Sequence, residues 1–319
     1  MGKHMQNISL VAGGAGFIGS HLCKNLLKNG HTIICLDDLS TGSKRNIDPF
    51  LDNKNFIFIN GSVTDSKVIL ELDKLSINEI FHLASPASVT YIMDHPVDAA
   101  QANSIGTKNL LEVARKKNAK FLFASSSEVY GDPKEHPQKE TYWGNVNPIG
   151  VRSGYDEGKR FGEALTFAYH RQYDIDIRIV RIFNTYGPNS SPKDTRIIPN
   201  FVTQAIRNVP LTVHGDGTQT RSLCFVSDLV EGMMLLMESD YKGPVNLGSP
   251  DEYRVIDIAK KIIDRFDSTS KITFVQRPKD DPSRRKPDIS LAQQKLNWQP
   301  KVSFEEGLGE TVKYFKEII

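Results

Sequence analysis

Residues 8–22 read ISLVAGGAGFIGSHL, and this stretch decides the fold. An apolar run at residues 8–12 is followed by glycines at 13, 16 and 19 and then by a helical pattern. This spacing permits a tight turn, lets the backbone approach a pyrophosphate, and lets a helix pack closely on the strand before it. The helix N-terminus would face the phosphates with free N–H groups and a positive dipole end. A glycine-rich turn without a ligand is the alternative. The flanking strand and helix, with Asp37 about 20 residues on, favour a dinucleotide site.

Outward from this turn, short apolar runs alternate with helical patterns. The predicted strands are rich in Ile, Leu, Val or Phe, as buried parallel strands are. They cover residues 8–12, 32–36, 56–59, 80–83, 121–124 and 177–182. Helices are predicted between them at 20–29, 99–117 and 155–173. The alternation predicts an α/β fold with right-handed crossovers and a doubly wound parallel sheet of the Rossmann type.

The pattern changes after residue 184. A polar loop at 188–199 and a glycine-rich turn at 215–217 interrupt it, and helices are predicted near 200–207, 228–237, 255–266 and 304–319. We therefore expect an NAD-binding domain over residues 1–184, with sheet strands continuing into the next segment, and a smaller mixed α/β lobe over 185–319. That lobe would close over the carboxyl ends of the strands, where open α/β sheets bind ligands.

Composition restricts the function classes. The chain has 319 residues and a net charge of +2, which predicts no nucleic-acid surface. No run approaches the ~20 apolar residues of a membrane helix, and the amino-terminal residues lack an apolar signal core. Cys23, Cys35 and Cys224 are scattered without metal-ligand spacing. A reduced, cytoplasmic setting without a metal site is expected.

Asp37 and Asp38 close the second predicted strand. A carboxylate there accepts hydrogen bonds from the adenosine ribose and repels the extra phosphate of NADP, which predicts NAD. Lys44 and Arg45 lie nearby and would argue the other way, but a solvated helix start is the preferred interpretation of this pair.

Tyr155 and Lys159 are four residues apart in a predicted helix and so share one face. A tyrosine hydroxyl is a poor base at its ordinary pKa of ~10. The ammonium of Lys159 and a positive nicotinamide ring would lower that pKa, and Lys159 could also hold the nicotinamide ribose. This spacing also arises by chance on many helices. It gains weight from the preceding strand end, Ser-Ser-Ser-Glu at 125–128, where a hydroxyl can share the substrate oxygen with Tyr155. A solvated turn is the alternative for these serines.

Together these motifs resemble the extended short-chain dehydrogenase/reductases, the NAD-dependent epimerase/dehydratase family that acts on sugar nucleotides. The nearer resemblance is to the UDP-glucuronate decarboxylases, or UDP-xylose synthases, and spans Asn7 to the C-terminus. It rests on the strand end HLAS at 82–85 and on SPAS at 85–88, SEVYGDP at 127–133, YWG at 142–144, NPIG at 147–150, YDEGKR at 155–160 and RKPD at 285–288.

The resemblance implies a three-step reaction. Tyr155 removes the proton of the sugar's 4-hydroxyl while hydride passes from carbon 4 to NAD. The 4-ketone is β to the carboxylate, so carbon dioxide leaves, and Ser126 and Tyr155 stabilise the enolate oxygen. Carbon 5 is then protonated and the hydride returns, so NAD is recycled. By the same resemblance, Glu128 and Arg285 are implied to lie near the carboxylate and to help in decarboxylation and protonation. A bidentate clamp on the sugar or diphosphate is a second role for Arg285.

Motifs and resemblance together assign the other ligand contacts, and they place the nucleotide of the sugar in the smaller lobe. The cofactor-binding residues are expected to be Gly13, Gly16, Phe17, Ile18, Gly19, Asp37, Asp38, Ser40, Thr41, Gly42, Ser62, Val63, Leu83, Ala84, Ser85, Tyr155, Lys159, Thr185 and Arg196. The substrate-binding residues are expected to be Ser88, Tyr91, Asn184, Pro199, Val213, Arg221 and Arg285. Arg221, taken alone, would be interpreted as a solvated arginine.

Relatives with other reactions differ at the serine-rich strand end. 4,6-Dehydratases usually carry Asp where Ser127 stands, and 4-epimerases usually lack Glu128, so this carboxylate favours decarboxylation over its alternative as a surface charge. The chain departs from the decarboxylases at Ser126 (usually Thr), Ser62 (usually Asp) and Gln101 (usually Lys), and again at residues 89–92.

Several alternatives remain open from the sequence. A UDP-sugar or UDP-uronate 4-epimerase, a nucleotide-sugar 4,6-dehydratase and a non-catalytic NAD-binding regulator would share the same fold. The resemblance also implies a homodimer in which the helices at 99–117 and 155–173 of two subunits form a four-helix interface. From the sequence, both helices could equally belong to the core.

Overall fold

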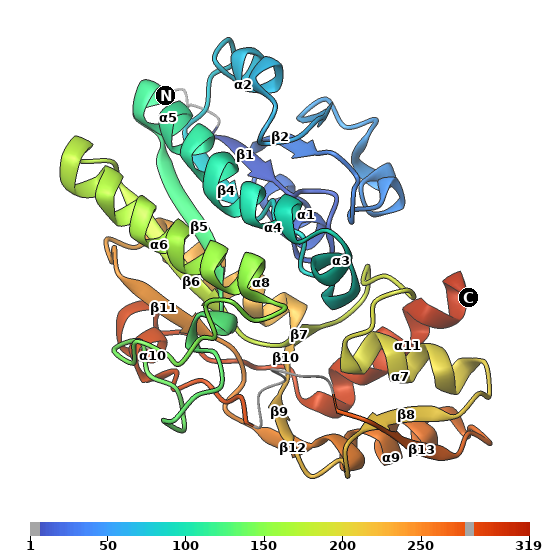
Figure 1. The fold of residues 1–319 in the computed structure, drawn as a ribbon. Coiled ribbons are helices and arrows are strands. Elements are labelled where there is room, and N and C mark those ends of the chain that lie inside the picture. The colour runs from blue at the N-terminus through green and yellow to red at the C-terminus, as the bar shows by residue number, and fades with distance from the viewer. Residues whose placement is uncertain (1–6, 278–283) are drawn as a thin grey trace.

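A seven-stranded parallel sheet forms the centre of the computed structural model, which describes residues 7–277 and 284–319 (Figure 1). Residues 1–6, where the sequence predicts no signal segment, lie outside the described part. The strand order is β11-β6-β5-β4-β1-β2-β3, so the chain starts inside the sheet and reverses direction beside β1. The strands are β1 (Ile8–Ala12), β2 (Thr32–Asp37), β3 (Phe56–Asn60), β4 (Glu79–His82), β5 (Lys120–Ser126), β6 (Ile177–Ile182) and β11 (Pro244–Leu247).

Helices cover both faces of this sheet. One face packs against α1 (Phe17–Lys28), α8 (Val226–Glu238) and α10 (Ser290–Leu296). The other packs against α2 (Ser66–Leu72), α5 (Thr107–Lys117) and α6 (Ser153–Tyr173). Successive residues along a strand point alternately into the core on one face of the sheet and the core on the other, as Leu10, Val11 and Ala12 do. The inner strands β1, β4 and β5 are largely buried on both faces and so are rich in apolar residues, which makes them visible in the sequence.

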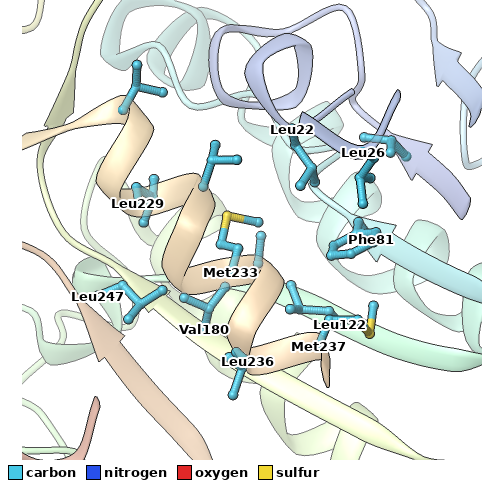
Figure 2. Close-up of a cluster of buried hydrophobic side chains, with 14 of the residues drawn as sticks. Leu22, Leu26, Phe81, Leu122, Val180, Leu229, Met233, Leu236, Met237 and Leu247 are labelled. Carbon is cyan, nitrogen blue, oxygen red and sulfur yellow. The ribbon is translucent and has the colours of Figure 1, made fainter. Parts of the chain in front are cut away.

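Figure 2 shows the first core in close-up. Met233 and Leu236 of α8 point at Val180 of β6 and Leu122 of β5, while Leu22 and its neighbours of α1 approach from the other side. Figure 2 also shows Leu247 of β11 on this cluster. Residues beyond 184 therefore complete the central sheet and its cover.

The predicted helix at 99–117 is interrupted. It begins with α4 (Pro96–Gln101), passes through the π-helical segment η3 (Ala102–Gly106) and continues as α5. Two polar side chains bond back along this segment, Asn103 Nδ2 to the Ala99 carbonyl and Thr107 Oγ1 to the Asn103 carbonyl, both at 2.8 Å. Such back-bonding competes with the regular ladder and accompanies distortion of helices.

The smaller lobe follows from the carboxyl end of β6 and fills the lower part of Figure 1. Three two-stranded pairs, β7 with β10, β9 with β12 and β8 with β13, pack with three helices around a third core. Their bounds are β7 (Thr185–Tyr186), β8 (Leu211–His214), β9 (Thr220–Ser222), β10 (Cys224–Phe225), β12 (Glu252–Arg254), β13 (Ile272–Val275), α7 (Ile197–Ile206), α9 (Val255–Phe266) and α11 (Phe304–Ile318).

The loop predicted at 188–199 ends earlier than expected, because α7 begins at Ile197. Pro199 lies in its first turn, where the missing N–H of proline is tolerated. Across residues 7–277 and 284–319, helices that combine the length and the apolar character needed to cross a membrane are absent.

The core of Figure 2 yields a stability prediction. Leu236 is 0% exposed, whereas Leu70 on α2 is 62% exposed. We expect Leu236→Ala to lower the free energy of unfolding by ~2–5 kcal/mol, because it removes buried methyl groups and leaves a cavity. Leu70→Ala, the same chemical change on the surface, should change it by less than ~0.5 kcal/mol. Urea titration followed by circular dichroism measures both. Equal losses would contradict the assignment of α8 to the core.

Candidate active site

The turn between β1 and α1 has room for glycine only. Gly13 has a φ of +84°, and a Cβ there would lie 2.7 Å from the backbone of Leu83 and Ala84. A Cβ on Gly19 would lie 2.0 Å from the Gly13 carbonyl oxygen. The helix N-cap is Gly16, and the structure gives the first turn of α1 no capping bond from a side chain in the described chain. Bare helix amides beside exposed backbone form an anion cradle.

Asp37 fixes this turn against the loop that follows β2. The buried carboxylate accepts hydrogen bonds from the Ala15 and Leu39 amides, both at 2.9 Å. Burial raises the pKa of Asp37 above its ordinary value, with the two amides opposing the shift. A Cβ on Gly42 would lie 2.7 Å from Asp37 Oδ1, so the loop must come close at this point. The loop itself is held by Asp38, which accepts from the Ser40 amide at 3.0 Å.

The other residues predicted for the cofactor follow the strand ends. Ser40, Thr41 and Gly42 follow β2, Ser62 and Val63 follow β3, Leu83–Ser85 follows β4, Thr185 begins β7, and Arg196 precedes α7. Within the described chain, Ser85 Oγ is buried and without a hydrogen-bond partner. A buried unpaired hydroxyl, a glycine-only turn and an uncapped helix are what a dinucleotide crevice requires, so these residues fit NAD.

Tyr155 and Lys159 lie together on the first turns of α6. Both are buried, and Lys159 Nζ lies 5.6 Å from the centre of the Tyr155 ring. Lys159 Nζ donates to the Ala124 carbonyl of β5 at 2.8 Å, which pins the helix to the end of that strand. A side-chain hydrogen bond joins Tyr155 to Ser126.

The structure distinguishes the three serines at the end of β5. Ser125 donates to Glu163 Oε1 at 2.6 Å, and Ser127 accepts from Arg285 Nη1 at 2.9 Å. Ser126 is the serine of the three that acts on Tyr155, where it lowers the pKa of the hydroxyl.

The expected lowering of the Tyr155 pKa by Lys159 is wrong for the protein alone. Burial raises the pKa of Tyr155 to about 12, and the hydrogen bond from Ser126 and the charge of Arg196 only partly offset this. Burial likewise lowers the pKa of Lys159 to about 7, against the opposing charge of Glu163. A desolvated lysine held by a carbonyl is a weak source of positive charge. Arg196, paired with Asp194 at 2.5 Å, is the cation that acts on Tyr155.

Glu128 lies in a cage of arginines in η4 (Ser127–Tyr130). Its Oε1 is 3.0 Å from Arg285 Nη1, and its Oε2 is 3.0 Å from Arg152 Nη2. Burial would raise the pKa of Glu128, but the charges of Arg285, Arg152 and Arg221 outweigh it and hold this pKa well below its usual range. Arg285 is itself buried, donates to the Gly131 carbonyl at 3.0 Å, and keeps its Nε buried without a partner among the described atoms. Two residues far apart in sequence thus form one buried ionic site.

Arg152 and Asp156 join this site although the sequence analysis gave them no role. Asp156 is 9% exposed, and burial together with the charge of Glu128 raises its pKa to about 7. The two residues are four positions apart at the start of α6, and this acid–base spacing was the available signal.

The residues predicted for substrate lie on both sides of the crevice. Asn184 lies between β6 and β7, Pro199, Val213 and Arg221 belong to the smaller lobe, and the charge of Arg221 reaches Glu128. Tyr91 lies in α3 (Val89–Asp94), and its ring centre is 4.5 Å from that of His95. Ser88 is the N-cap of that helix. Thr90 Oγ1 meets Thr195 Oγ1 at 3.2 Å and so joins α3 to the loop before α7.

Comparison with known proteins agrees with this geometry. Residues 10–311 match the family model described as GDP-mannose 4,6 dehydratase. UDP-glucuronic acid decarboxylase 2 of Arabidopsis thaliana is 50% identical over 97% of this chain and 68% of its own length. UDP-glucose 4-epimerase of Thermotoga maritima, solved with UDP-glucose, superposes with a TM-score of 0.91 at 31% identity, covering 98% of this chain and 99% of its own. UDP-glucuronic acid 4-epimerase of Bacillus cereus, solved with UDP-glucuronic acid and NAD, gives 0.87 at 29% identity, covering 98% and 100%.

The glycine turn yields a binding prediction with a matched control. Gly13 and Gly30 have nearly the same φ, +84° and +82°, but a Cβ on Gly30 would have no described atom within 4 Å. Both Ala variants incur the strain of a positive φ, whereas only Gly13→Ala also pushes the turn away from β4. We expect NAD to raise the melting temperature of Gly30→Ala as it does that of the wild type, and to leave Gly13→Ala unchanged. An equal NAD shift in the two variants would show that this turn does not hold the dinucleotide.

Proposed function

Because the chain belongs to the GDP-mannose 4,6 dehydratase family, we propose that it is a carboxy-lyase that converts UDP-glucuronate into UDP-xylose and carbon dioxide with recycled NAD. The observation that carries the proposal is the buried Glu128–Arg285 pair beside Tyr155, in a chain so similar to a UDP-glucuronic acid decarboxylase. The residue between Ser126 and Glu128 is Ser127, which accepts a hydrogen bond from Arg285. A serine is not an acid that could expel water, as a 4,6-dehydratase requires.

The chain's own residues would hold the dinucleotide along the crevice. The backbone from Gly13 to Gly19 receives the pyrophosphate, and the Asp37 region receives the adenosine ribose. Ser85 and Lys159 line the half that takes the nicotinamide. When bound, NAD accepts a hydride from carbon 4 of the sugar and later gives it back.

Tyr155 acts on the proton of the sugar's 4-hydroxyl. Its high pKa in the protein alone must fall for it to act as a base, and Ser126 and Arg196 are the groups that favour its anion. The bound nicotinamide adds a further positive charge beside the ring. Tyr155 and Ser126 then donate to the oxygen of the 4-ketone. Since this ketone is β to the carboxylate, the electrons of the breaking carbon–carbon bond flow onto an oxygen that two hydroxyls stabilise.

A 4-epimerase acting on the same sugar is the second candidate, supported by the B. cereus neighbour that was solved with UDP-glucuronic acid and NAD. Its reaction would keep the carboxylate and needs no arginine-held glutamate next to the tyrosine. A non-catalytic regulator would have no use for a tyrosine, lysine and serine brought together in a buried site. The Glu128 cage therefore favours decarboxylation.

The diphosphate and base of the substrate are placed against the smaller lobe, residues 185–319. Arg221 in β9 supports this, because it is almost buried and its charge reaches the Glu128 cage. A planar guanidinium suits a diphosphate, to which it can donate two parallel hydrogen bonds.

Homodimerisation through a four-helix interface is also part of the proposal. α5 and α6 run side by side in Figure 1, and α4 and η3 pack on α6. Apolar side chains stand exposed on these elements, among them Ile105 at 45% and Phe161 at 51%. Pairing with a second copy would cover them. The three buried free thiols, Cys23, Cys35 and Cys224, support a reduced, cytoplasmic compartment.

The reaction is tested directly with UDP-glucuronate and catalytic NAD. Wild type should release carbon dioxide and form UDP-xylose without net NADH. Tyr155→Phe should lower kcat by ~10²–10⁴-fold, because it removes the general base while keeping the ring. Its NAD-induced rise in melting temperature should persist and shows that the fold is intact. UDP-galacturonate as the product would establish the epimerase instead.

The dimer is tested by light scattering after size exclusion. Phe161→Glu should convert a dimer into a monomer, because it places two charges in an apolar interface. Leu70→Glu, an equally drastic change at an exposed site on α2, should leave the dimer intact. A monomeric wild type would contradict the interface.

A further inference from the structure

We propose that Asp156 supplies the proton that carbon 5 of the sugar takes up after carbon dioxide has left, and that the cavity beside it restores this proton from solvent. The inference rests on the proposed decarboxylation and adds the acid that this reaction needs.

The proton balance requires a donor other than Tyr155. When the carbon–carbon bond breaks, carbon dioxide leaves and its bonding electrons form an enolate. A new C–H bond at carbon 5 then consumes one proton per turnover. The proton that Tyr155 took from the 4-hydroxyl is committed, because it must return to the same oxygen when the ketone is reduced. A second acid within reach of the site is therefore needed.

Glu128 cannot be that second acid. Although burial opposes its charge, Arg285, Arg152 and Arg221 hold the pKa of Glu128 well below its usual range, so it is a carboxylate at neutral pH. As a fixed anion it can orient a water molecule by accepting a hydrogen bond. It carries no proton of its own to give.

Asp156 has the opposite character. Its Oδ1 is buried and, within the described residues, lacks a hydrogen-bond partner. The groups that face it are Glu128 from η4, Arg152 just before α6, Arg285 from the segment after β13, and its neighbour Glu157. Burial and Glu128 raise the pKa of Asp156 to about 7, and the two arginines only moderate this. The aspartate can therefore hold its proton near neutral pH.

A cavity of about 220 Å³ connects the two carboxyl groups. Glu128 and Asp156 lie on its wall, while Asn145 and Asn147 bring it to the exposed surface. At roughly 30 Å³ per molecule it has room for several waters, and its polar wall offers them partners. The Asp156 O–H bond breaks as its proton passes to a water ordered by Glu128, and that water gives a proton to carbon 5. Solvent then reprotonates Asp156 through the cavity.

The test compares Asp156→Asn with Glu157→Gln, which removes an equivalent charge from the next residue of α6. UDP-glucuronate is added to each NAD-loaded enzyme, and absorbance at 340 nm, carbon dioxide and products are followed. Asp156→Asn should form NADH and release carbon dioxide at first, then accumulate bound NADH with the decarboxylated enolate, which still lacks its proton at carbon 5. Its steady-state turnover should fall ~10²-fold or more. Glu157→Gln should turn over like the wild type, and Asp156→Glu should restore part of the loss.

A pH profile adds a readout that a structural role would not move. Because the protonated form is the donor, wild-type turnover should decline as pH rises through the pKa of Asp156, and Asp156→Asn should lose this limb. Full turnover of Asp156→Asn, with an unchanged decline at alkaline pH, would overturn the inference. Carbon dioxide release by the wild type would in that case still support the decarboxylase. Loss of the initial NADH signal would also overturn it, since the defect would precede protonation. A wild type that releases no carbon dioxide would instead sink the proposed function.

Discussion

The ion pair between Glu128 and Arg285 is the interaction on which the site depends. It joins the end of β5 to a segment that lies 157 residues later in the chain. The same segment is anchored by Gln138, whose amide donates to the Lys286 carbonyl at 2.9 Å, and its Arg285 carbonyl accepts from the Ser222 amide. A buried arginine without its carboxylate would be strongly destabilised. Loss of the charge on Glu128 would therefore leave the buried Arg285 without this counter-charge.

The charge of Glu128 also affects the protonation states of the acids next to it. One buried acid, Glu128, is anionic because cations surround it, and its charge then raises the pKa values of both Asp156 and Tyr155. Burial acts in the same direction on these two. Groups whose environments drive their pKa values apart can take different roles in one reaction. Here one carboxyl group is fixed as an anion while the other can hold a proton.

Sequence patterns predicted the parts of this structure that local chemistry determines. The strands Ile8–Ala12 and Ile177–Ile182 have the bounds that the sequence predicts, because burial of the sheet leaves short segments rich in Ile, Leu and Val. The turn at residues 13–19 is equally clear in the sequence, since Gly13 and Gly19 have no room for a side chain. The π-helical segment η3, the short α2 and the raised pKa of Tyr155 were not predicted. They depend on what packs against each residue, which a linear pattern does not contain.

The cage also explains how one fold can support several reactions on sugar nucleotides. The glycine turn, Asp37 and the Tyr155–Lys159 pair lie on the strands and helices that the epimerase structures share with this chain. Arg285 comes from an irregular segment after β13 and pairs with Glu128, the residue just beyond Ser127. In the proposed reaction, oxidation at carbon 4 would use this shared framework, whereas the outcome at carbon 5 would depend on Glu128, Asp156 and the arginines around them.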